Sequence, residues 1–167
     1  MKQIVKQAFA WLAILSCGVS LARAEVPWAR DLQQDAVAAR ALQGVVLLIF
    51  VSTRCPYCET ALNDFLIPMS GNADYLAKVV MRRIESRSAR ELRDFSGRRT
   101  SHGKFAFEQG TRLTPTVMVF DYTGHPLAKP VVGITTPDYY GAYLDQAIDQ
   151  GVAKVRAGLT SLLPDGS

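Results

Sequence analysis

The stretch VVLLIFV at Val45–Val51, followed by STR and then CPYC at Cys55–Cys58, decides how this sequence folds. Its continuous apolar run, rich in β-branched residues, predicts a central strand buried on both faces. A helix is expected from Cys55 to about Leu66, with a proline in its first turn, where a missing N–H costs nothing. Thiols three positions apart at a helix start lie on one face, so the two cysteines can form a disulfide. Free N–H groups and the helix dipole favour a thiolate at Cys55, so the motif predicts redox chemistry.

The N-terminal segment predicts export. Two lysines give a positive start, an apolar core runs from Phe9 to Leu21, and Ala22-Arg23-Ala24 fits a small-x-small cleavage pattern. We therefore expect a signal peptide at residues 1–24 and a mature domain at residues 25–167, which is long enough for one real core. The expected location is the periplasm or the secreted fraction, where a cysteine pair meets an oxidising environment.

Removing the signal changes the charge of the protein. The full chain has a formal net charge of +4, from 19 basic and 15 acidic residues. Lys2, Lys6 and Arg23 lie in the predicted signal and no acidic residue does, so the mature charge falls to about +1. A nucleic-acid partner loses most of its support, and none is expected.

The same cleavage changes the cysteine count. Cys17 lies in the apolar core of the predicted signal, so only Cys55 and Cys58 remain in the mature chain. One alternative is cleavage before Cys17 with lipid attachment, as in bacterial lipoproteins. Leu15 disfavours it, because that position of a lipobox needs a small residue.

The rest of the chain alternates between helical and strand patterns. Pro68 is expected to end the helix that the cysteines open, and Tyr140, Tyr143 and Leu144 to share the apolar face of a terminal helix. This order indicates an α/β sandwich with a central sheet, and a late hairpin makes the sheet mixed. The other expected elements are helices at 28–42, 70–76, 88–95, 104–109 and from 136 onward, and strands at 79–84, 116–120 and 127–134.

The sequence resembles the thioredoxin superfamily over residues 28–155. Besides the CPYC motif after a buried strand, the matching parts are Thr114-Pro115 before the strand at 116–120, and Gly133 before a terminal helix. The resemblance implies a thioredoxin-like three-layer sandwich, with a central mixed β-sheet flanked by helices. It also implies a cis Pro115 that faces the cysteines, and a Thr114 backbone that pairs with an extended substrate segment.

Some residues depart from the family pattern. Arg54 stands where thioredoxins have tryptophan, and Ile49 stands where they have a buried acid. CPYC is the motif of glutaredoxins, but their Thr-Val-Pro is absent here, which argues against glutathione specificity. With these departures, the chain more closely resembles secreted bacterial thioredoxin-like thiol-disulfide oxidoreductases than classical thioredoxins or glutaredoxins.

This resemblance and the residues together predict a protein that exchanges disulfides. Cys55 is the expected nucleophile and Cys58 the resolving thiol, so no cofactor is expected. The dipeptide between them lacks the histidine that helps to make strong oxidants, and a dimerisation domain of the kind that disulfide isomerases use is missing. We therefore expect a reductase, and a monomer. Its partners would be a protein with a disulfide or dithiol and a membrane electron-transfer protein. The expected substrate-binding residues are Arg54, Pro56, Tyr57, Thr114 and Pro115.

Two alternatives stay open at this stage. One is a metal-binding module or metallochaperone of the same fold, in which the two cysteines, with loop and turn residues His102 and His125, hold zinc or copper. The other concerns an arginine-rich segment at 82–104, which could dock an acidic partner or a membrane surface. A solvated face is preferred, and Phe95, Phe105 and Phe107 are expected in the core. The basic residues of this segment are Arg82, Arg83, Arg87, Arg90, Arg93, Arg98, Arg99 and Lys104.

Overall fold

A mixed four-stranded sheet forms the centre of the computed structural model, which describes residues 24–160. Its strands are β1 (Val45–Val51), β2 (Val79–Glu85), β5 (Thr116–Phe120) and β6 (Val131–Val132), in the order β2-β1-β5-β6. β1 pairs with β2 in parallel, whereas β5 runs antiparallel to both of its neighbours. The positions of β1 and β5 match the sequence prediction. The predicted signal peptide and Cys17 lie outside the described residues, except for Ala24.

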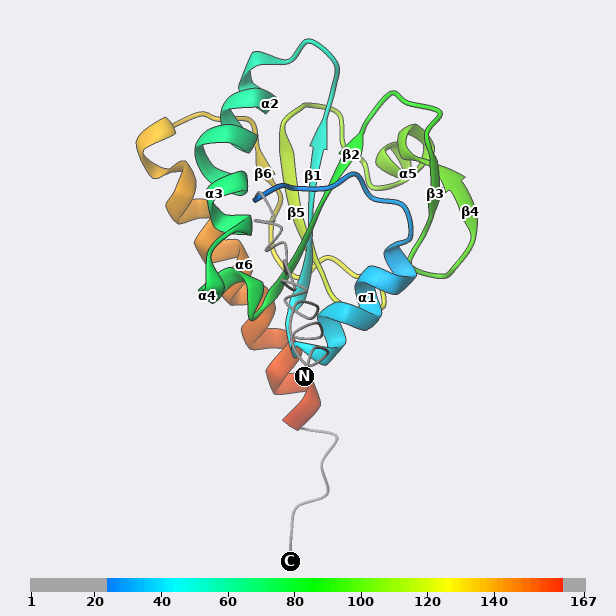
Figure 1. Cartoon of the computed structure of the whole chain (residues 1–167), viewed down its shortest axis with the longest axis vertical. Coiled ribbons are helices and arrows are strands. Elements are labelled where there is room, and N and C mark those ends of the chain that lie inside the picture. The colour runs from blue at the N-terminus through cyan, green and yellow to red at the C-terminus, as the bar shows by residue number, and fades with distance from the viewer. Residues whose placement is uncertain (1–23, 161–167) are drawn as a thin grey trace, which may run out of the picture.

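Alternate residues of β1 feed two separate cores, one on each face of the sheet. Val45, Leu47 and Ile49 belong to the core under the helices that follow the cysteines and under the last helix, α6 (Pro137–Thr160). Val46, Leu48 and Phe50 belong to the core under α1 (Leu32–Ala41) and α5 (His102–Glu108). All seven residues of β1 are buried, which explains the unbroken apolar run. The predicted three-layer sandwich is therefore correct, as Figure 1 shows.

The first helix is shorter than predicted. α1 spans Leu32–Ala41, and Asp31 caps it by accepting a hydrogen bond from the Gln34 N–H at 3.0 Å. Trp28 lies before this cap in extended backbone and forms a bridge with Arg83 of β2. In the sequence, the helical spacing of apolar residues extends back to Trp28. In the structure, the bridge to β2 at the edge of the sheet keeps Trp28 out of the helix.

The helix opened by the cysteines continues past Pro68, so the predicted stop is wrong. α2 (Pro56–Thr60) passes into a π-helical segment, η1 (Ala61–Leu66), and then into α3 (Ile67–Ser70). In the π-helical segment the Ile67 N–H bonds to the Leu62 carbonyl, five residues back. Pro68 thus stands at the start of a new α-helical turn, where its missing N–H is tolerated. A short α4 (Ala73–Leu76), capped by Asn72, follows as expected.

The helix predicted at 88–95 is wrong, because a β-hairpin stands there. β3 (Glu91–Arg93) pairs with β4 (Arg99–Ser101). Leu92 is buried between an exposed Glu91 and a half-buried Arg93, which is the two-residue period of a strand. Asp94 holds the turn, since its Oδ1 accepts the N–H groups of Ser96 and Arg98 at 2.9 Å each.

Several side chains lie elsewhere than predicted. His102 is fully buried at the start of α5 (His102–Glu108) rather than in a loop. Phe107 is 68% exposed instead of buried, and Tyr143 is exposed on α6 beside the buried Tyr140 and Leu144. The strand predicted at 127–134 is only two residues long in the structure, and these two residues follow Pro130. Within residues 24–160, no helix is long and apolar enough to cross a membrane.

Candidate active site

Cys55 and Cys58 are joined in a disulfide just beyond the end of β1. Their Cα atoms lie 5.2 Å apart, within the usual range for a disulfide. Cys55 is the N-cap of α2 and has extended backbone, and Pro56 follows as the first helical residue. Arg54, the residue before Cys55, has φ 56°, a left-handed conformation that is uncommon for a residue with a side chain. The chain thus turns sharply from the strand into the helix, with the disulfide at the turn.

The two sulfurs have different surroundings. Cys58 is 3% exposed and packs in the same core cluster as Ile49 and Ala61. Cys55 is only half-buried, and its Sγ accepts a hydrogen bond from the Cys58 N–H at 3.2 Å. Only Cys55 is therefore open to an incoming group, while Cys58 lies behind it.

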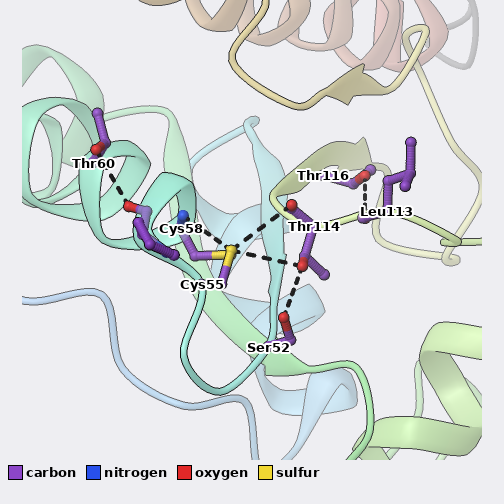
Figure 2. Close-up of a disulfide and its surroundings, with 8 residues drawn as sticks. Ser52, Cys55, Cys58, Thr60, Leu113, Thr114 and Thr116 are labelled. Atoms are coloured by element: carbon purple, nitrogen blue, oxygen red, sulfur yellow. Dashed lines mark hydrogen bonds between the residues drawn. A yellow bond between two sulfur atoms is a disulfide. The ribbon is translucent and has the colours of Figure 1, made fainter.

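The loop before β5 faces the disulfide. The Thr114–Pro115 peptide bond is cis, as the family resemblance implied. Thr114 Oγ1 lies 3.7 Å from Cys55 Sγ, and the Thr114 carbonyl oxygen lies 3.8 Å from the same sulfur (Figure 2). The Cys55–Cys58 pair and the Thr114–Pro115 pair, which are far apart in sequence, therefore lie next to each other.

Ser52 joins this group and was missed by the sequence analysis. Its Oγ lies 2.8 Å from Thr114 Oγ1. A hydroxyl has one hydrogen, so when Thr114 donates to Cys55 Sγ, Ser52 must donate to Thr114. Ser52 directly follows β1. Binding sites in such sheets form at the carboxyl ends of the parallel strands, so the sequence position of Ser52 could have predicted it as a site residue.

Both ends of the cis loop are anchored. Thr116 Oγ1 donates to the Leu113 carbonyl at 2.8 Å, and the Gly133 N–H donates to the Pro115 carbonyl at 2.7 Å. Gly133 has φ +66°, a conformation that glycine adopts without steric cost. The glycine singled out in the sequence thus holds the loop that faces the cysteines.

A thioredoxin-like domain model matches residues 32–148, which include the disulfide, the cis-proline loop and Gly133. The chain belongs to the thioredoxin-like family. Thiol-disulfide oxidoreductase activity follows at the level of this family, given the Cys55–Cys58 disulfide.

Solved thioredoxin structures resemble this thioredoxin-like domain. Thioredoxin Mala s 13 of Malassezia sympodialis is 21% identical, with 78% of this chain and 93% of that one covered and a TM-score of 0.49. Spinach chloroplast thioredoxin F is 16% identical, with 73% and 95% covered and a TM-score of 0.47. Oxidised mitochondrial thioredoxin 3 of Saccharomyces cerevisiae is 12% identical, with 74% and 93% covered and a TM-score of 0.46. No curated protein sequence matches the chain.

The remaining residues predicted for the thioredoxin-like site lie at its surface. Arg54, Pro56 and Tyr57 are all exposed, and Tyr57 is 66% accessible. Leu113, on the other side of the disulfide, is also exposed. Exposed apolar side chains near Cys55 therefore come from two segments, helix α2 and the loop before β5.

The histidines considered as metal ligands are engaged elsewhere. His102 Nδ1 accepts the Glu85 N–H at 3.0 Å, and its Nε2 lies 2.8 Å from the Ala29 carbonyl. His125 lies in the turn after β5, as predicted, with Nδ1 2.6 Å from Thr123 Oγ1. Among the described residues, no three His, Cys, Asp or Glu side chains are grouped to hold a metal ion.

Proposed function

We propose that this thioredoxin-like protein is an exported reductase of protein disulfides, with Cys55 as its nucleophile. The observation that carries the proposal is the contrast between the two sulfurs. Cys55 is half-exposed and receives the Cys58 N–H, with the Thr114 hydroxyl close by, whereas Cys58 is buried. Hydrogen bonds to a thiolate stabilise it, so the accessible sulfur is also the one prepared to carry negative charge.

The reaction runs in two exchanges. The Cys55 thiolate attacks one sulfur of a substrate disulfide, forming a mixed disulfide and releasing the other substrate sulfur as a thiolate. Cys58, one helical turn behind, loses its proton and attacks Cys55 Sγ, which frees the second substrate thiol. Two electrons and two protons pass to the substrate, and the protein is left with the Cys55–Cys58 disulfide.

The cis-proline loop is assigned to substrate binding. The Thr114 carbonyl lies beside Cys55 Sγ, where an extended substrate segment can pair with the backbone next to the attacked bond. Tyr57 and Leu113 offer apolar contact on either side, and Arg54 and Pro56 complete the rim. The partner is accordingly a protein segment rather than a small molecule.

The direction of electron flow is argued from the donors at Cys55. A strong oxidant needs a reduced form that is unusually stabilised. Here the two groups directed at Cys55 Sγ, the Cys58 N–H and the Thr114 hydroxyl, are neutral, and the Pro56-Tyr57 pair adds no histidine. Neutral hydrogen-bond donors at the Cys55 thiolate favour a reducing couple, with a membrane electron-transfer partner to keep it reduced.

Export rests on the sequence of residues 1–24. A monomeric mature protein that starts at Glu25 would meet its substrates in the periplasm or outside the cell. Sequencing the N-terminus of the protein from a periplasmic fraction tests this part. A mature chain that keeps Met1 would contradict it.

Insulin reduction by dithiothreitol tests the activity. We expect the wild-type protein to accelerate insulin precipitation and Cys55→Ala to reduce the rate to that of dithiothreitol alone. Tight stoichiometric zinc or copper binding without any thiol-dependent turnover would instead favour the metallochaperone. Equal turnover by the Cys55→Ala variant would rule out Cys55 as the nucleophile.

A further inference from the structure

A groove opens beside the disulfide, with Phe107 of α5 in its wall. It shares Ser52 and Thr114 with the site, and Thr114 is the residue that contacts Cys55 Sγ. Its volume is about 300 Å³, enough for one or two side chains of a bound segment. The full lining is Ser52, Ser86, Arg87, Phe107, Thr111, Arg112 and Thr114.

The two arginines of the groove have no acidic partner within residues 24–160. Arg87 follows β2 and is exposed, with no ion pair among the described residues. The Arg112 guanidinium lies 5.3 Å from the centre of the exposed Phe107 ring and likewise meets no carboxylate there. By contrast, Arg82 and Arg98 are paired with Asp35 and Asp94 at 2.7 and 2.9 Å.

The composition of the groove defines its ligand. Besides the arginines it presents hydroxyl side chains and one aromatic ring, and no acid lines it. Uncompensated guanidinium groups favour a carboxylate, which can accept two parallel N–H donors from an arginine. Arg112 stands two residues before Thr114, so its position is tied to the loop that faces the sulfur.

We propose that this groove selects protein substrates with an acidic side chain one to three residues from the attacked cysteine. An extended chain advances about 3.3 Å per residue, so a segment paired with Thr114 brings such a side chain over the groove. Arg87 and Arg112 then hold the carboxylate, and Phe107 packs against its stem. This inference rests on the proposed disulfide exchange at Cys55 and adds the substrate class.

The expected selectivity is moderate. Arg87 and Arg112 are both exposed, so water and salt screen each pair, and the effect falls mainly on the association rate. We expect about a fivefold preference for an acidic over a neutral substrate at 50 mM salt, which corresponds to two modest exposed pairs. The preference should fall toward one at 0.5 M salt.

Stopped-flow exchange between the reduced protein and matched disulfide peptides tests the proposal. The peptides carry Glu, Gln or Lys at the flanking positions and have blocked termini, so that only the side chains supply charge. The rate with the Gln peptide tests disulfide exchange itself, and the Glu-to-Gln ratio tests the groove. A measurable Gln rate with a ratio of one in the wild type would overturn the groove and leave the proposed function standing. No exchange with any peptide would overturn both.

Charge variants complete the test. The double variant R87Q/R112Q should bring the Glu-to-Gln ratio to about one. R87E/R112E should prefer the Lys peptide, a reversal that a misfolded protein cannot produce. Arg99→Gln removes an exposed arginine of β4 that lies outside the groove and should keep the wild-type ratio. A preference for Glu that survives in R87E/R112E, or that Arg99→Gln abolishes, would contradict the proposal.

Discussion

Arginines lie both at the β3–β4 hairpin and in the groove beside the disulfide, but among the described residues only two of them, Arg93 and Arg98 of the hairpin, have an acidic partner. Arg93 pairs with Asp31 at 3.2 Å and Arg98 with Asp94 at 2.9 Å, while Arg90 lies 5.0 Å from the Trp28 ring centre. Arg87 and Arg112 have no such acidic partner among the described residues. Arg93 and Arg98 thus help to hold the structure around the hairpin, whereas Arg87 and Arg112 at the disulfide edge stay available to a ligand. The predictions below separate these two uses, stability at the hairpin and reaction at the disulfide edge.

The largest effect is expected at the disulfide edge. Cys58→Ser should trap substrate as a mixed disulfide with Cys55, because the resolving thiol is missing. Cys55→Ser should trap nothing, since Cys58 is buried. Non-reducing electrophoresis and mass spectrometry of protein mixed with a disulfide peptide measure this. Trapping through Cys58 would show that the assignment of the two cysteines is reversed.

At the hairpin, Asp94→Ala should lower the free energy of unfolding by about 2–3 kcal/mol, because two backbone N–H groups lose their acceptor. Asp94→Asn keeps that acceptor and loses only the pair with Arg98, which is 75% exposed, so its cost should be below about 1 kcal/mol. Urea unfolding gives both values. Neither change should alter the rate of disulfide exchange with a neutral peptide. A tenfold drop in that rate would show that the hairpin also contributes to the reaction at the disulfide edge.

His102 should make stability depend on pH. Burial lowers the pKa of His102 below its ordinary 6.5, and the positive charge of Arg90 adds to this, while the Ala29 hydrogen bond and Glu85 oppose it. The unfolded chain therefore binds a proton first as the pH falls. Stability is complete above about pH 6.5 and declines as the pH drops toward the folded pKa, by at most about 1.4 kcal/mol per unit.

Protonation of His102 Nδ1 would also remove the acceptor of the Glu85 N–H. Urea unfolding between pH 7 and pH 5 measures the slope, and His102→Gln should flatten it. A slope unchanged in that variant would assign the pH dependence to other groups.

The smallest effect compares two glycines in the same conformation. Gly133 and Gly110 have φ +66° and +70°, and a Cβ at either would meet nothing within 4 Å. Alanine at either position should therefore cost about 1 kcal/mol of stability. Only Gly133→Ala should also slow disulfide exchange, because the Gly133 N–H anchors the Pro115 carbonyl. Equal exchange rates in the two variants would mean that this anchor does not position the loop.

The elements with a strong local signal were predictable from the sequence. β1 and β5 were found with their observed bounds, because strands buried on both faces read as unbroken apolar runs. Thr114, Pro115 and Gly133 were found by resemblance to a family, and the cysteines by their spacing. In each case the signal lies within a few adjacent residues.

Features set by distant contacts were not predictable in this way. The helix expected at 88–95 is a hairpin because Asp94 organises its turn and because Leu92 is buried between more exposed neighbours, the spacing of a strand. His102 looked like a loop residue because its partners, Glu85 and Ala29, are remote in sequence. The arginine segment at 82–104 forms one basic run in the sequence, and only the structure separates Arg87 from the arginines that are paired.

The reduction potential of the Cys55–Cys58 couple tests the central claim most directly. Equilibration of the purified protein in redox buffers, with both thiol states counted by alkylation and mass spectrometry, gives the value. A reductase whose Cys55 thiolate is held by neutral donors should have a potential of about −220 mV or lower, in the range of glutaredoxins and thioredoxins. A value near −120 mV, typical of strong oxidants, would contradict the proposed direction.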